Sequence, residues 1–286
     1  MNKILLNINN LSISSIPERK TLVKSVSFSV RQGEPFTLIG ETGCGKTLIA
    51  QALTGALSKD LSATGCIEFD GINLVKLSGK ERQKLWGKKM FLLPQEPRLA
   101  LNPSMRVIKQ VAEVLRYLQG QQPNNAQKNA NTLISDLGLS PSLDGRQYPF
   151  RLSGGMNQRI LLAIALATPA EFIVADEPTK GLDADLKDSA VRLLQNLVER
   201  GRTLLCITHD LAVARDLGGY IAVMYGGYIV ESGPAEKVLN FPGHPYTRGL
   251  IKAAPENGLE PIPDHVLSSM KTAWNNSGSK QMETCS

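Results

Sequence analysis

The chain has no long hydrophobic run. Within its 286 residues, no apolar stretch approaches the roughly 20 residues that a membrane-spanning helix needs. The N-terminal segment Met-Asn-Lys-Ile-Leu-Leu-Asn contains an apolar run that is too short for a secretory signal. We therefore expect a soluble protein that is made and kept in the cytosol.

Cysteines are few and widely spaced. The four lie at positions 44, 66, 206 and 285, and none belongs to a Cys-x-x-Cys pair. Cys66 and Cys206 lie in apolar runs, so we expect both to be small buried residues. This usage fits a reducing compartment.

The sequence also lacks internal repeats and blocks of like charge. The net charge of +6, with a pI of about 9.1, could suit anionic lipid or nucleic acid. Because Lys and Arg are scattered along the chain, a solvated surface is the better interpretation. The hydrophobic content of 42% is ample for the core of one large domain or two small ones.

A glycine-rich segment follows a short apolar run at 36–39, which predicts a buried strand. Its glycines let successive backbone N–H groups point inward, and a helix predicted over 47–57 adds its positive N-terminal end. Lys46 would reach the β- and γ-phosphates of a nucleotide, and the Thr47 hydroxyl would bind Mg²⁺. The alternative is a plain glycine-rich turn before a helix. The candidate ATP-binding residues are Gly40, Glu41, Thr42, Gly43, Cys44, Gly45, Lys46 and Thr47.

A second candidate site ends the apolar run 172–175, which predicts another buried strand. Asp176 and Glu177 follow it, at the end of a parallel strand where ligands bind in α/β sheets. Asp176 would hold Mg²⁺. Glu177 would polarise the attacking water or accept its proton.

Further motifs follow in the chain: Gln95 after the apolar run 90–94, Ser153-Gly154-Gly155, Lys180-Gly-Leu-Asp183 and His209. Their order resembles that of the Q-loop, signature, D-loop and switch histidine in the nucleotide-binding subunits of ABC transporters, along residues 3–255. The resemblance implies catalytic roles for Gln95, Glu177 and His209. It places Thr47, Gln95 and Asp176 at Mg²⁺. It adds nucleotide contacts from the signature and the D-loop, which here are Ser153, Gly154, Gly155 and Asp183.

The signature motif is typical of a protein that works as a dimer. Ser153, Gly154 and Gly155 precede a helix predicted over about 156–167, and together they offer a second anion site. The resemblance implies that this site meets the γ-phosphate held by the partner's Lys46. ATP would then join the two subunits, and its hydrolysis would release them.

The expected fold class is α/β, the P-loop ABC ATPase fold. It would have a mostly parallel core sheet, an N-terminal antiparallel β layer and an inserted helical subdomain at about 97–150. We predict one ATPase domain over 1–255 and a partly disordered tail over 256–286. Gly226-Gly227 predicts a hairpin, and two helices are expected at 107–118 and 126–137, with a polar linker at 119–125 between them.

Three segments resemble the peptide and nickel importer subfamily: 95–103, 148–156 and 242–250. Within the last, His244 and Tyr246 are better interpreted as part of a structural turn than as a metal or catalytic pair. The chain departs from the family in two ways. Ser14, Ser15 or Ile16 stands where an adenine-stacking aromatic is usual, and the C-terminal cysteines of an iron–sulfur centre are missing.

The resemblance implies an ATP-hydrolysing importer subunit at the cytoplasmic face of the membrane. Its partners would be a second ATPase subunit, which we expect to be a paralogue, two permeases and a solute-binding protein. The cargo stays open between peptides, nickel and metal chelates. The alternatives are a nucleic-acid-associated ABC ATPase and a P-loop kinase. The first is disfavoured because the chain has one phosphate loop and no sustained heptads, and the second would lack the signature.

Cys44 leaves one question open. It lies within the phosphate loop, two residues before Lys46 and near a helix N-terminus, which would favour a reactive thiolate. It could equally replace a small residue and stay shielded.

Overall fold

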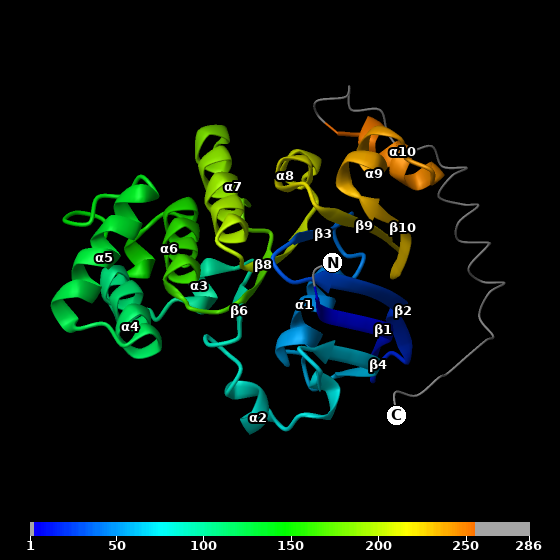
Figure 1. Ribbon diagram of the computed structural model, residues 1–286, viewed down its shortest axis with the longest axis horizontal. Helices are drawn as coiled ribbons and strands as arrows, with labels where there is room; N and C mark the ends of the chain where they lie inside the picture. Colours follow the sequence, from blue (N-terminus) through cyan, green and yellow to red (C-terminus); the bar gives the residue numbers. More distant parts are fainter. Residues whose placement is uncertain (1–2, 255–286) are drawn as a thin grey trace. The chain divides into compact units, whose positions relative to one another are not determined.

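The computed structural model describes residues 3–254, which divide into two compact units (Figure 1). Unit 1 comprises residues 3–31, 35–77 and 208–254, and unit 2 comprises 32–34 and 78–207. The expected domain boundary at 255 and the tail over 256–286 lie at or beyond the end of the described residues.

Unit 1 contains an antiparallel sheet with strand order β2-β1-β4-β5. Its strands are β1 (Ile4–Ser15), β2 (Lys20–Arg31), β4 (Leu61–Phe69) and β5 (Ile72–Asn73). Inward positions of β1 and β2 alternate with exposed ones, as expected of a sheet with one buried face. This is the predicted N-terminal antiparallel β layer.

The phosphate loop follows a second group of strands in unit 1. β3 (Pro35–Gly40) pairs in parallel with β9 (Tyr220–Tyr225), which pairs antiparallel with β10 (Tyr228–Pro234). Gly226 and Gly227 have φ of 56° and 91°, so the predicted hairpin is confirmed. In its described part, unit 1 also contains the α-helices α1 (Lys46–Thr54), α8 (Leu211–Leu217), α9 (Ala235–Asn240) and α10 (Pro245–Lys252).

Unit 2 contains the parallel strands β6 (Met90–Leu93), β7 (Phe172–Asp176) and β8 (Thr203–Thr208), in the order β8-β7-β6, with Thr208 at the unit boundary. Its helices are α2 (Gly79–Gln83), α3 (Pro97–Ala100), α4 (Val107–Gln119), α5 (Pro123–Asp136), α6 (Gly154–Ala167) and α7 (Ala184–Glu199). α4 packs against α5 and α6 (Figure 1).

The predicted helices are present, but several of their bounds were wrong. α1 ends at Thr54 rather than 57 because Gly55 takes a left-handed conformation and caps it. α5 begins inside the predicted linker because Pro123 stands at its first position, where a missing N–H costs nothing. α8 and α10 were not predicted, and each has only one short apolar face.

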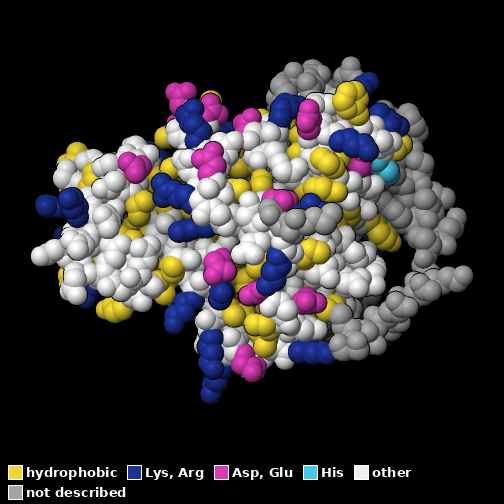
Figure 2. Space-filling model, in the orientation of Figure 1, with side chains coloured by type: hydrophobic (Ala, Val, Ile, Leu, Met, Phe, Trp, Pro, Cys, Tyr) yellow, Lys and Arg dark blue, Asp and Glu magenta, His cyan; other side chains and the backbone are white. Residues whose placement is uncertain are grey.

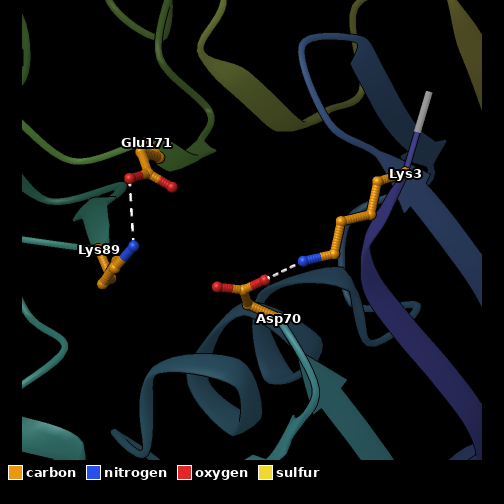
Figure 3. Close-up of polar contacts among 4 residues, drawn as sticks. All are labelled: Lys3, Asp70, Lys89 and Glu171. Carbon is orange, nitrogen blue, oxygen red and sulfur yellow. Dashed lines mark hydrogen bonds and ion pairs between the residues drawn. The ribbon is translucent and has the colours of Figure 1, made fainter.

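Two ion pairs, one in each unit, lie at the surface (Figure 3). Lys3 pairs with Asp70 in unit 1, and Lys89 lies 3.2 Å from Glu171 in unit 2. Exposed pairs of this kind contribute little stability, typically up to about 1 kcal/mol. The stability of each unit therefore comes from buried apolar strands and helix faces.

Candidate nucleotide site

The phosphate loop in unit 1 depends on three glycines with positive φ. Gly40, Gly43 and Gly45 have φ of 154°, 85° and 108°. A Cβ at Gly40 would lie 2.1 Å from the Met224 carbonyl oxygen, and one at Gly45 would lie 2.8 Å from Val23 Cγ2. A Cβ at Gly43 would meet nothing within 4 Å. Gly40 and Gly45 thus seat the loop on its neighbours, whereas Gly43 keeps one side of it open.

Lys46 is the first residue of α1, so the helix starts one residue earlier than predicted, and Thr47 lies in its first turn. The residue Lys46 is 6% exposed, and its ammonium group donates to the carbonyl oxygens of Gly40 (2.7 Å) and Glu41 (2.8 Å). The positive charge of Lys46 therefore lies at the phosphate loop. The N-terminal end of α1 adds its partial positive charge there, and both favour the binding of an anion. A bound phosphate would exchange those carbonyls for anionic oxygens.

Cys44 is shielded. It is 7% exposed, and burial raises the pKa of its thiol more than the nearby Lys46 ammonium lowers it. The Lys46 nitrogen lies 3.7 Å from the Cys44 sulfur. Because the thiolate is the reactive form, this burial and the raised pKa favour the shielded alternative over a reactive Cys44.

Tyr246 of α10 is a residue that sequence reasoning did not connect with the loop. It is fully buried, and its ring lies 4.4 Å from that of Tyr225. Burial and the neighbouring Glu41 carboxylate raise its pKa. No described group makes a well-formed hydrogen bond to its hydroxyl. Helix α10 thus places an aromatic ring beside the start of the phosphate loop.

His244 has a structural role in the same segment. Its Nδ1 accepts from the Tyr246 N–H at 3.2 Å and so caps α10. Its backbone N–H donates to Glu231 at 3.0 Å. The prediction that His244 is structural is confirmed, although the segment is a capped helix rather than a turn.

His209 lies in the short connection between β8 and α8 and is exposed. The next residue, Asp210, caps α8 by accepting from the N–H groups of Ala212 (2.9 Å) and Val213 (3.3 Å). The Asp210 N–H donates in turn to the Thr208 hydroxyl at 3.1 Å. His209 is therefore followed directly by a residue whose position is fixed by three hydrogen bonds.

The two candidate carboxylates of unit 2 lie at the end of β7, as predicted. Asp176 and Glu177 are 3% and 7% exposed. Glu177 has φ of 50°, and its N–H donates to the Ile207 carbonyl at 2.8 Å. A left-handed conformation costs a residue with a Cβ roughly 1–3 kcal/mol, and such strain is typical of functional sites.

The signature residues of unit 2 begin α6. The helix starts at Gly154 rather than near 156, so both glycines lie in its first turn. The Ser153 hydroxyl accepts from the Met156 N–H at 3.2 Å and caps the helix. A Cβ on Gly155 would lie 3.1 Å from the Gly181 carbonyl oxygen, whereas one on Gly154 would meet nothing within 4 Å. Glycine at 155 permits close contact with the D-loop, and Gly154 leaves the helix end open.

The remaining candidates are also in unit 2. Gln95 is partly buried between β6 and α3. Asp183 caps α7 by accepting from the Leu186 N–H at 3.1 Å. Gln158 of α6 donates to the Pro178 carbonyl at 3.0 Å, which ties the signature helix to the segment after Glu177.

Within residues 3–254, no group of three or more His, Cys, Asp or Glu side chains could hold a metal ion by itself. Unit 1 carries the phosphate loop and His209, while unit 2 carries the two carboxylates, Gln95, the signature and Asp183. A strand, a glycine-rich loop and a helix that begins with Lys-Thr, together with acidic residues after a parallel strand, define a P-loop nucleoside triphosphatase.

Comparisons with known proteins identify the family. The ABC transporter family matches residues 23–180, and the oligopeptide/dipeptide transporter C-terminal region matches 230–274. The chain is 36% identical to the dipeptide transport ATP-binding protein DppD of Escherichia coli over 259 residues, which cover 88% of this chain and 79% of the relative. It is 36% identical to the oligopeptide transport ATP-binding protein OppD of Bacillus subtilis, over 88% of this chain and 72% of the relative.

A solved structure supports the same assignment. The ATP-binding cassette MJ0796, described as a dimeric post-hydrolysis state bound to ADP and Pi, matches with a TM-score of 0.72 and 25% identity. The match covers 80% of this chain and 98% of that one. The chain belongs to the ABC transporter family, as one of its ATP-binding subunits, and it binds and hydrolyses ATP. The predicted fold class is confirmed.

The alternative of a nucleic-acid-associated ATPase gains no support from these relatives. On the face drawn in Figure 2, Lys and Arg side chains alternate with Asp and Glu, which fits the solvated surface that the sequence predicts. Within the described residues, none of the helices has the length and hydrophobicity that crossing a bilayer requires.

Proposed function

We propose that this chain is the ATPase subunit of an importer of peptides. The observation that supports this most directly is the match of residues 230–274 to the oligopeptide/dipeptide transporter C-terminal region, beside relatives named for dipeptide and oligopeptide transport. Nickel and metal chelates, which the sequence leaves open, become the less favoured cargo. Two permeases and a solute-binding protein would complete the importer, with this subunit at the cytoplasmic face of the membrane.

Lys46 and the N–H groups of the loop would bind the β- and γ-phosphates. Thr47, Gln95 and Asp176 would hold Mg²⁺, because their hydroxyl, carboxamide and carboxylate oxygens are of the donor type that the ion prefers. Bound there, Mg²⁺ would neutralise phosphate charge.

Glu177 would accept a proton from water as the water oxygen attacks the γ-phosphorus and the bond to the β-phosphate oxygen breaks. His209 would hydrogen-bond the γ-phosphate or the attacking water. The left-handed backbone at Glu177 supports this role because strain of this kind is typical of functional sites.

We propose further that the hydrolytic site is shared between two ATPase subunits. The capped N-terminus of α6, with Gly154 open to solvent, supports this because its unpaired first-turn N–H groups would bind the γ-phosphate held by the partner. Asp183 would lie beside this contact. The partner would be a paralogue, which gives a heterodimer.

Ser153→Arg tests the shared site. A bulky cation at the start of α6 should leave ATP binding in its own chain intact and stop hydrolysis in the partner's site. Mixing this variant with Lys46→Ala subunits assigns the loss to one site. Ser135→Arg, the same change at an exposed serine of α5, is the matched control and should keep full activity. Loss of ATP binding by the Ser153→Arg chain itself would refute the shared site.

The cargo is tested in cells. Replacing the wild-type subunit by Lys46→Ala should reduce uptake of a labelled dipeptide and leave uptake of labelled nickel unchanged. The opposite pattern would refute peptide import, but it would not count against the assignment of the chain as an ATPase.

A further inference from the structure

Unit 2 contains a cavity of about 400 Å³ that none of the ATP motifs lines. It lies between the start of α4, one face of α5 and the segment that follows α5. Its polar lining consists of Arg106, Lys109, Gln127, Asn131, Ser142 and Arg146. Its volume falls within the range of small-molecule sites, about 300–1,000 Å³.

The backbone builds this cavity in a defined way. The N–H groups of Val107 and Ile108, in the first turn of α4, donate to the carbonyls of Gln147 and Gly145, each at 3.0 Å. A Cβ on Gly145 would lie 2.7 Å from the Pro141 carbonyl oxygen, so only glycine allows the segment to fold back this closely. These contacts fix the segment 141–147 against the start of α4, so that Arg146 lines the same cavity as Arg106 and Lys109.

Among the residues that the structure describes, three cations line the cavity and no carboxylate does. Within residues 3–254, Arg106, Lys109 and Arg146 take part in none of the ion pairs. The acid nearest in sequence, Asp144, accepts from the Ser140 N–H at 2.8 Å. Three like charges that face one space repel one another, and a multivalent anion would remove that repulsion.

Neutral donors complete the lining. Gln127 and Asn131 are one turn apart on α5, and the Gln127 amide donates to Asn131 at 3.2 Å, which leaves the Asn131 amide hydrogens available. The Ser142 hydroxyl lies 3.2 Å from that of Ser140. Two guanidinium groups, one ammonium, an amide and a hydroxyl form a donor set suited to the several oxygens of a phosphate group.

We propose that this cavity binds a phosphate-bearing anion. Because the space exceeds a bare phosphate, the group would be carried on a small organic compound or on the headgroup of a phosphorylated lipid. The shared chemistry is a phosphate group held by Arg106, Lys109 and Arg146. The site is separate from the phosphate loop and does not depend on the identity of the cargo.

The test uses the full chain with its ATP site filled by a non-hydrolysable ATP analogue and Mg²⁺. Inorganic pyrophosphate is then titrated by calorimetry. The triple variant Arg106→Gln/Lys109→Gln/Arg146→Gln should bind pyrophosphate at least about tenfold more weakly than wild type, because each charge-assisted contact is lost. The matched control, Lys80→Gln/Lys84→Gln/Arg116→Gln, removes the same charge at exposed positions elsewhere in unit 2 and should bind like wild type.

A second variant removes any dependence on how the triple variant folds. Asn131→Phe changes no charge and fills the cavity from an exposed position on α5, so it should also weaken pyrophosphate binding. Both variants should keep wild-type ATP hydrolysis.

Sedimentation with vesicles separates the two sources of phosphate. Binding to phosphatidylcholine vesicles that contain phosphatidylinositol 4-phosphate, lost in the triple variant, would assign the site to a lipid headgroup. Pyrophosphate binding without vesicle binding would assign it to a soluble phosphate compound. Equal behaviour of the triple and control variants in both assays, or no binding in either assay, would overturn the proposal.

Discussion

Replacing Gly40 by alanine should destabilise the protein far more than the same change at Gly43. Both glycines have positive φ, which costs alanine roughly 1–3 kcal/mol at either position. At Gly40 the new Cβ would also lie 2.1 Å from the Met224 carbonyl oxygen, within the parallel pair that β3 forms with β9. Overpacking of this kind adds about 1–3 kcal/mol.

The expected loss in the free energy of unfolding is therefore about 4 kcal/mol for Gly40→Ala and about 2 kcal/mol for Gly43→Ala. At about 2–4 °C per kcal/mol, these correspond to melting shifts of roughly 8–16 °C and 4–8 °C. Urea unfolding followed by circular dichroism measures the difference. The added methyl of Gly43→Ala points into open space beside the loop, so this variant should weaken ATP binding instead. Equal stability of the two variants would refute the close-contact argument.

Two further predictions concern the surroundings of the loop. The Cys44 thiol should resist a maleimide in the folded protein and react in urea, and rapid labelling of the native thiol would contradict its burial. Because the pKa of Cys44 is raised above the ordinary 9.0, the unfolded chain ionises first. The wild type should therefore lose stability relative to Cys44→Ser as the pH rises above about 9. Tyr246→Phe should change the free energy of unfolding by less than about 1 kcal/mol, because the hydroxyl has no well-formed hydrogen bond. Tyr246→Ala should lower it by about 3–5 kcal/mol, because the buried ring is lost. Equal losses in urea unfolding would show that the hydroxyl rather than the ring supports the loop.

The sequence predicted those parts of the site that depend on local chemistry. Gly40 to Thr47 forms a strand–loop–helix segment because its glycines can take positive φ, and that requirement is visible in the residue types. Asp176 and Glu177 could be placed because β7 is a continuous apolar run with a clear end. In the same way, the paired glycines at 226–227 marked the hairpin.

Contacts between segments that are distant in the chain could not be predicted. The position of Tyr246 beside Glu41 depends on how α10 packs, and nothing in the sequence around either residue encodes it. The burial of Cys44 is also a tertiary property, so the sequence alone left a reactive and a shielded thiol equally open. The cavity of unit 2 gathers cations from α4 and from a segment more than 30 residues later, which a scan for local charge blocks does not detect.

The most direct test of the account is Glu177→Gln. The carboxamide keeps the size of the side chain and cannot accept the proton of the attacking water, so phosphate release should nearly stop while ATP still binds. Light scattering with Mg²⁺ and ATP should then show a stable complex of two ATPase subunits, whereas ADP should not support this complex. The paralogue is added to the measurement where the chain does not pair with itself. Near-normal phosphate release by Glu177→Gln, or ATP-bound subunits that stay monomeric, would contradict the shared hydrolytic site on which the proposed mechanism rests.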